Sequence, residues 1–271
     1  QGGAPEGIGI GLRSVHLQEI AAEKPEIAWL EVLADNFIEH GDYALEHLKE
    51  IASHYPVSLH SVSMSIGSSD PFDYQYLGRI KELERLLKPF CLSDHLCWSS
   101  VHGVHFHNLL PLPFTDETVD YIVGRVSTLQ DFFGRRMAIE NISSYLSFDQ
   151  STMSEAEFIN RILERADCDM LLDVSNVAVT SFNNDMDALS YLRSLPRERV
   201  AYMHLGGFED RGEYLLDTHS CLVADSSLDL YREALKIVGR KPTLLEWDNE
   251  IPELSLLLAE AQRIESHISD I

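Results

Sequence analysis

Eight short apolar runs, separated by longer amphipathic stretches, recur from one end of this 271-residue chain to the other and restrict the folds open to it. The runs are IGIGL at 8–12, IAWLEVL at 27–33, VSLHSV at 57–62, FCLSDHL at 90–96, MAIEN at 137–141, DMLLDV at 169–174, VAYMHL at 200–205 and TLLEWD at 243–248. Near-continuous apolar runs bounded by turn residues are typical of parallel strands that are covered on both faces. Eight strand–helix units in succession predict a closed (β/α)₈ TIM barrel, with a doubly wound open sheet as the alternative.

The stretches between the runs show the three- and four-residue spacing of amphipathic helices. Aliphatic residues recur at this spacing over 77–87 and over 119–129, which predicts a helix in each range. Ser154, followed three residues later by Glu157, has the pattern of a capping box and predicts the start of another helix. Pro252 predicts the start of the last helix.

The composition restricts the class of protein. No run approaches the ~18 consecutive apolar residues that a membrane span needs, and no Pro/Ser-rich linker divides the chain. We therefore expect one cytoplasmic domain over 1–271 that has no membrane contact, with 1–7 as a flexible tail. The 44 acidic and 21 basic residues give a formal net charge of −23, which disfavours binding to nucleic acid.

Histidines and carboxylates fall at the carboxyl ends of the predicted strands, the face at which barrel enzymes carry their active sites. The candidates at or just beyond a strand end are His60, Asp94, His95, Glu140, Asp173, Asn176, His204, Asp217, His219 and Glu246. Each of them alone has an ordinary explanation as a helix cap or a hydrogen-bonded rim residue. Together in a closed barrel they would meet at one opening, where they would lose solvation and repel one another unless cations were bound.

The donor types narrow the choice of metal. No cysteine lies among the candidates, so a thiolate zinc site or an iron–sulfur cluster is disfavoured. Mixed imidazole and carboxylate donors suit iron, manganese, zinc or cobalt, and their number predicts two or three ions that share a carboxylate. In the loop after the fourth strand, His102, His105 and His107 are candidates for a place close to a substrate.

Seven short motifs in a fixed order carry a resemblance to a known family. They are LHSVSMSIGS, SDHLCWS, IENIS, LLDVSNV, MHLGG, LLDTHS and LLEWDNEIP, and they span nearly the whole chain. This set resembles the multinuclear non-heme iron-dependent oxidative enzymes, the family that includes the methanobactin-biosynthesis oxygenase. The resemblance implies a xylose isomerase-like barrel, related in shape to the trinuclear-metal apurinic endonucleases.

The resemblance also implies a ligand assignment. Three sets of side chains would each hold one iron ion: His60, His95 and Glu140; Glu140, Asp173, His204 and Glu246; and Asn176, Asp217 and His219. The ions would be a mixture of ferrous and ferric iron, with zinc or manganese as substitutes in purified protein. The endonuclease relatives have a histidine where this chain has Asn176, and this weaker donor, with the acidic surface, argues against DNA repair.

The implied activity is the oxygen-dependent modification of a cysteine in a ribosomally made peptide, with a small partner protein that presents the leader segment of the peptide. Glu140, as the bridging ligand, and Asp94 and His107, as proton relays, are the expected catalytic residues. Two alternatives use the same barrel. One is a divalent-metal sugar isomerase or phosphoester hydrolase, and the other is a metal-binding scaffold without catalysis.

Overall fold

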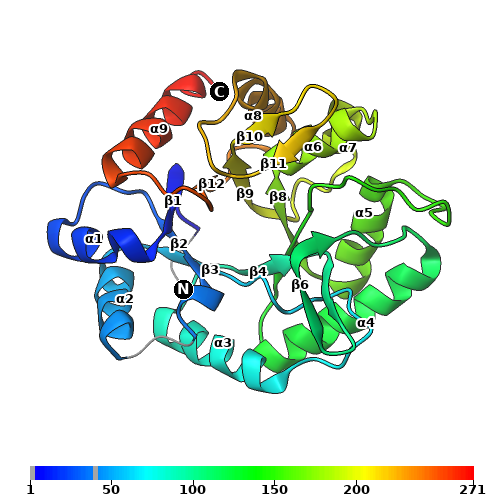
Figure 1. Cartoon of the computed structure of the whole chain (residues 1–271), viewed down its shortest axis with the longest axis horizontal. Coiled ribbons are helices and arrows are strands. Elements are labelled where there is room, and N and C mark those ends of the chain that lie inside the picture. The colour runs from blue at the N-terminus through cyan, green and yellow to red at the C-terminus, as the bar shows by residue number, and fades with distance from the viewer. Residues whose placement is uncertain (1–3, 39–41) are drawn as a thin grey trace.

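The computed structural model describes residues 4–38 and 42–271 and shows a ring of parallel strands surrounded by helices (Figure 1). The barrel strands are β1 (Ile8–Leu12), β2 (Leu30–Leu33), β3 (Val57–His60), β4 (Leu92–His95), β7 (Ala138–Glu140), β8 (Asp169–Asp173), β9 (Val200–Gly206) and β12 (Thr243–Glu246). They pair in chain order, and β12 pairs with β1 to close the ring. The eight predicted runs coincide with these eight strands, so the closed barrel is confirmed and the open sheet is excluded.

Helices form the outer layer, and apolar residues on their inner faces cover the barrel. They are α1 (Leu17–Glu23), α2 (Asp42–His54), α3 (Tyr74–Leu87), α4 (Asp116–Phe133), α5 (Glu155–Ala166), α6 (Val174–Asn183), α7 (Ala188–Ser194), α8 (Asp225–Val238) and α9 (Leu254–His267), with short 3₁₀ turns η1 (Ser14–His16) and η2 (Ala34–Asn36). The apolar stripes predicted over 77–87 and 119–129 are the buried faces of α3 and α4. Within the described ranges, no helix combines the length and the apolar character needed to cross a membrane.

A side-chain cap explains where α5 begins, whereas α9 begins without one. Ser154 accepts a hydrogen bond from the backbone N–H of Glu157, as the predicted capping box requires, whereas the carboxylate of Glu157 pairs with Arg161 one turn further on. The last helix, α9, has Glu253 at its N-cap. The prediction that Pro252 opens this helix is therefore wrong by two residues.

The predicted flexible tail lies only partly within the described residues. Residues 1–3 of the tail are outside them, and residues 4–7 precede β1 without helix or strand. The carbonyl of Gly7 nevertheless accepts hydrogen bonds from the indole of Trp29 and from the backbone N–H of Thr243. The end of this segment is thus joined to the barrel.

The connections that follow β4 and β9 each contain a small hairpin on the barrel rim. The strands are β5 (Trp98–Val101) with β6 (Val104–Leu110), and β10 (Phe208–Asp210) with β11 (Leu215–Asp217). His102 and Gly103 both have positive φ angles, as a two-residue hairpin turn requires. Figure 1 shows the first hairpin close to α4 and the second close to α6, so they occupy different parts of the rim.

The ring of Trp29 lies so close to Gly9 in β1 that no side chain fits at this position. A Cβ atom at this position would lie 2.4 Å from a ring carbon of Trp29, whose side chain is fully buried. Gly124 in the middle of α4 offers the opposite case, because nothing lies within 4 Å of a Cβ built there.

We expect Gly9→Ala to lower the free energy of unfolding by about 2 kcal/mol, since the buried Trp29 ring has no room to move aside. Gly124→Ala should instead raise it by about 0.5–1 kcal/mol through helix propensity alone. Urea denaturation of the two variants against the parent protein measures both effects. A Gly9→Ala variant as stable as the parent would contradict the close approach.

Candidate metal centre

The barrel gathers imidazoles and carboxylates from separate strands at one end. His60, His95, Glu140, Asp173 and Glu246 are the last residues of β3, β4, β7, β8 and β12. His204 lies two residues before the end of β9. All six side chains are at most 7% exposed, because the neighbouring strand ends and the loops above them exclude solvent.

Donor atoms from these residues approach one another closely enough to share ions. Three groups have donor atoms that all lie within 4.8 Å of one another: His60, His95 and Glu140; Glu140, Asp173, His204 and Glu246; and His219, Glu246 and Asp248. Glu140 and Glu246 each belong to two groups and join the three into one cluster. Two ligands of one ion, each about 2.1 Å from it and at a right angle, lie about 3 Å apart. The Nε2 atoms of His60 and His95 are 3.4 and 3.3 Å from Oε2 of Glu140, close to this separation.

Several of these donor atoms are buried and make no hydrogen bond within the described structure. They are His60 Nε2, Glu140 Oε2, Asp173 Oδ2 and His219 Nε2, together with Asn176 Oδ1 and Asp217 Oδ1 beside these groups. His219 Nε2 and Asp217 Oδ1 face each other at 2.7 Å. A buried polar atom without a partner costs about 1–3 kcal/mol. Cations between these atoms would remove that cost, so the residues present fit a multinuclear metal site.

Hydrogen bonds behind the cluster fix the orientation of the His60 ring. Its Nδ1 atom lies 2.7 Å from the hydroxyl of Ser93, which lies 2.6 Å from the hydroxyl of Tyr202. The Tyr202 hydroxyl donates to Glu31 at 3.0 Å. Because Nδ1 of His60 is engaged in this chain, its Nε2 atom remains available for an ion.

Glu31 on β2 connects the hydrogen bonds of Tyr202 and Ser93 to a second imidazole, that of His204. Its Oε1 atom lies 3.0 Å from Nε2 of His204, and Nδ1 of His204 faces Glu246 and Glu140 at 3.1 and 3.3 Å. Burial favours a higher pKa for Glu31, but the imidazoles of His204 and His60 outweigh it and bring the pKa to about 2. Glu31 is thus an ionised carboxylate beneath the cluster.

The crowded donors shift one another's pKa values. Burial raises the pKa of Glu140 well above its ordinary value and that of Asp173 to about 7. Burial favours a lower pKa for His204, but the surrounding carboxylates, with Glu31 first among them, raise it well above the ordinary value. Metal binding needs ionised carboxylates and neutral imidazoles, and a cation placed among these groups favours both forms.

The third group differs from the predicted set. Nδ1 of His219 lies 3.2 Å from both Asp248 and Glu246, so Asp248, which is not among the predicted ligands, belongs to this group. On the other side of the ring, Nε2 of His219 faces Asp217. Asn176 lines a cavity together with these two residues, and its Oδ1 atom is unpaired. Asp248 lies two residues after the strand-end carboxylate Glu246, and this spacing is the signal in the sequence that points to it.

Two glycines at the end of β9 allow the following loop to return over the barrel. A Cβ atom on Gly206 would lie 2.5 Å from a ring carbon of His219, and one on Gly207 would lie 2.2 Å from the carbonyl oxygen of Cys221. The backbone N–H of His219 donates to the carbonyl of Gly207 at 2.9 Å. The two glycines of the MHLGG motif therefore leave the space that His219 and its loop occupy.

The two predicted proton relays occupy different environments. Asp94 is fully buried and accepts hydrogen bonds from the backbone N–H groups of His95 and Met64 at 2.6 and 3.0 Å. It lies behind His95, and the cavity walls do not include it. His107 on β6 is exposed and lines the larger cavity described below.

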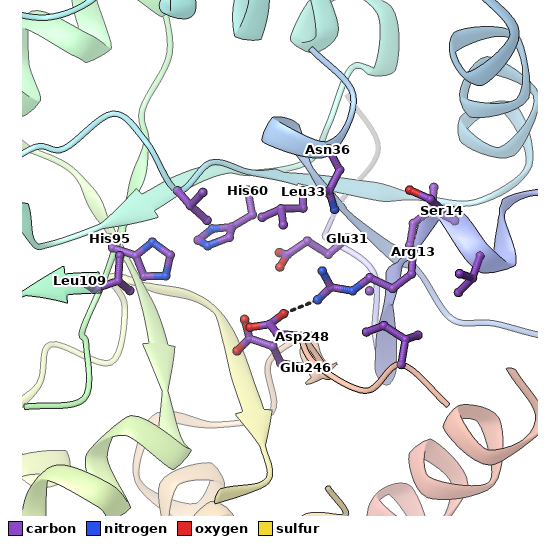
Figure 2. A pocket seen from close by; sticks show the side chains of 15 residues that line it. Arg13, Ser14, Glu31, Leu33, Asn36, His60, His95, Leu109, Glu246 and Asp248 are labelled. Carbon is purple, nitrogen blue, oxygen red and sulfur yellow. Dashed lines mark hydrogen bonds and ion pairs between the residues drawn. The ribbon is translucent and has the colours of Figure 1, made fainter. Parts of the chain in front are cut away.

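Two cavities open above the cluster and share His95, Glu246 and Asp248 as wall residues. The smaller, of about 520 Å³, is shown in Figure 2, where Arg13 reaches from the end of β1 to the carboxylate of Asp248. The larger, of about 730 Å³, extends between the two rim hairpins. Several of the donor residues therefore lie at the base of these cavities.

Fold and site together define a barrel with a cluster of residues able to bind metal ions, and comparison with known proteins identifies its family. The family model described as RiPP precursor modification enzyme MbnB/TglH/ChrH matches residues 7–269. The chain belongs to this family, which confirms the resemblance seen in the motifs. Membership implies an enzyme that acts on the precursor of a ribosomally synthesised and post-translationally modified peptide.

Relatives cover nearly the whole chain. A UPF0276 protein of Acaryochloris marina is 43% identical over 265 residues, which cover 98% of this chain and 96% of that protein. A UPF0276 protein of Vibrio parahaemolyticus is 37% identical over 268 residues, which cover 97% and 93%.

Solved structures support the fold alone. Endonuclease IV from Thermus thermophilus has a TM-score of 0.62 at 14% identity and covers 98% of this chain and 100% of its own. An L-ribulose 3-epimerase has a TM-score of 0.62 at 15% identity, with coverage of 98% and 93%. The expected xylose isomerase-like barrel is thereby confirmed.

We expect Gly206→Ala to displace His219 and to lower the tightly held metal by one ion per chain, because the two groups that contain Glu140 remain intact. His219→Ala, which removes the ring without crowding, should give the same loss. Metal content after dialysis, measured by inductively coupled plasma mass spectrometry, checks both variants. Gly78→Ala on α3, where a Cβ meets nothing within 4 Å, is the matched control. Full metal content in both site variants would exclude an ion at the third group.

Proposed function

We propose that this chain is a multinuclear iron enzyme that uses molecular oxygen to oxidise a cysteine of a ribosomally made precursor peptide. The observation that carries the proposal is the buried set of unpaired imidazole and carboxylate donors, joined through Glu140 and Glu246, beside a cavity of peptide size. Two or three bound iron ions, ferrous and ferric, would supply the redox chemistry and take the substrate thiol. The proposal includes a small partner protein that presents the leader segment.

The protein's own thiols support a role for a substrate thiol at the metal. None of the three donor groups contains a cysteine. Burial raises the pKa values of all four cysteines, to about 12 for Cys91 and Cys168 and above the ordinary value for Cys97 and Cys221, so these side chains stay protonated and do not compete for a metal ion. A thiolate in the opening would therefore come from the substrate.

Residues around the cluster stabilise the ionised form of one carboxylate, position one imidazole and line the cavity above it. Burial favours a higher pKa for Asp248, but His219 and the guanidinium of Arg13 outweigh it and lower the pKa below the ordinary value. Asp94 fixes the backbone of His95 and thereby positions its ring. His107 lies on the wall of the larger cavity, where it can exchange a proton with a bound peptide.

The test uses iron-loaded protein and synthetic candidate precursors, taken from the short cysteine-bearing reading frames beside its gene. We expect a mass change in one peptide only when both iron and oxygen are present. The same peptide with each cysteine replaced by serine should remain unchanged, because it lacks the thiol. Mass spectrometry after aerobic and anaerobic incubation measures the result.

Two outcomes would contradict the proposal. A modification that proceeds without oxygen, or equally well with zinc, would favour the isomerase or hydrolase alternative, which needs only a redox-inert ion. Unchanged peptides under every condition, including co-expression with candidate partner proteins, would favour a scaffold that binds metal without catalysis.

A further inference from the structure

We infer that the free edge of β6 binds the substrate peptide as an added β-strand and directs it into the metal cluster. The identity of the occupant follows from the family, whose members modify precursor peptides, and the consequence for catalysis rests on the proposed function. The binding mode itself rests on the geometry of the β5–β6 hairpin.

β6 is a seven-residue strand that, among the described residues, pairs only with β5. Every residue from Val104 to Leu109 is exposed, including the large apolar side chains of Val104, Phe106 and Leu109. A strand with one unpaired edge presents a row of N–H and C=O groups that another extended chain can pair with.

The unpaired edge faces the larger cavity. Residues 105–110 line this cavity without interruption, whereas Ser99 is the one β5 residue on its wall. Side chains alternate between the two faces of a strand, so a cavity against one face would contact every second residue. The register of the hairpin shifts between the Ser100–His105 and Trp98–Leu110 pairs, so residues 106–109 bulge from the β5 ladder and expose their backbone as well as their side chains to the cavity. Because Glu140 and Glu246 line the same cavity, a peptide paired with β6 would lie beside the metal donors.

The hairpin is held rigidly from its other side, by the segment that follows β3. The hydroxyl of Ser65 accepts hydrogen bonds from the backbone N–H groups of Ser99 and Ser100 at 2.9 and 3.2 Å. The carboxylate of Asp70 accepts from both residues of the hairpin turn, and Arg125 donates to three carbonyls of this segment. A strand edge that is already ordered loses little conformational entropy when a peptide pairs with it.

β6 lacks the features that keep strand edges from pairing. Its sequence, VHFHNLL, contains no lysine, proline or carboxylate, in a chain with a net charge of −23. The strands of the other rim hairpin are three residues long and carry Glu209, Asp210 and Asp217. Short strands and charged side chains discourage pairing, so the two hairpins differ in the way expected if only β6 receives a peptide.

The hairpin register identifies a backbone group to remove. Val101 and Val104 flank the two-residue turn and form its hydrogen-bonded pair, so the next pair, Ser100 and His105, directs its backbone groups outward. His105→Pro therefore removes an N–H from the free edge and leaves the β5 pairing intact. His105→Ala removes the same side chain and keeps the N–H, which makes it the matched control.

The binding test uses the iron-loaded enzyme without oxygen, so that the peptide is bound and not consumed, and fluorescence anisotropy of the labelled synthetic precursor. We expect His105→Pro to raise Kd about tenfold, as the loss of one to two backbone hydrogen bonds does. His105→Ala should change it less than about threefold, an effect within the range of a surface substitution. Equal affinities for the parent and His105→Pro would overturn the inference, as would an absence of binding to the parent enzyme.

A second measurement does not depend on how the variants fold. Single N-methyl groups placed along the peptide backbone block pairing only where the N–H faces β6, and these positions alternate. We expect Kd to rise at every second position over the residues that pair with β6. A loss of affinity that does not alternate between successive positions would overturn the inference.

The two proposals fail in different ways. A peptide that is oxidised with iron and oxygen, but whose Kd ignores both His105→Pro and N-methylation, leaves the proposed function intact and removes the β6 docking mode. A peptide that binds with period two but is never oxidised leaves the docking mode intact and removes the proposed oxidative chemistry.

Discussion

Everything at the mouth of this barrel depends on how buried imidazoles and carboxylates are stabilised away from water. Glu140 and Asp173 end neighbouring strands and are almost inaccessible to solvent, so burial raises the pKa values of both. Hydrogen bonds within the protein satisfy only part of these carboxylates. Asp173 uses one oxygen to cap α6 through the N–H of Asn176, and its other oxygen is left unpaired. The role of Asp173 as a helix cap and its proposed role as a metal ligand are therefore compatible, since each uses a different oxygen.

Support beneath the cluster comes from a polar chain through the barrel interior. Glu31, Tyr202 and Ser93 link the rings of His204 and His60, which belong to different donor groups. Because one nitrogen of each ring faces this polar network, the other nitrogen is directed toward the shared carboxylates. The closed barrel makes this linkage possible, since it brings β2, β4 and β9 into one interior.

Barrel strands and helices were predictable because they alternate between continuous apolar runs and amphipathic stripes. The rim hairpins were not, since β6 is solvent-exposed along almost its whole length and lacks the burial pattern by which strands are recognised. The candidate site was predictable where a donor ends a strand, as His60 and Glu140 do. Asp248 was missed because it lies beyond the strand, where the chain path depends on tertiary contacts with Arg13 and His219. Which nitrogen of an imidazole faces an ion likewise depends on contacts that sequence does not reveal.

Glu140 and Glu246 each serve two donor groups, and this sharing has a thermodynamic consequence. An ion in the central group would neutralise both bridging carboxylates and so alter the field felt by ions on either side. Occupancies of adjacent groups would then be linked, and metal titration would follow a cooperative or stepwise isotherm in place of independent binding. The outermost ion, bound partly by a loop that two glycines allow to fold back, would exchange with solution most readily.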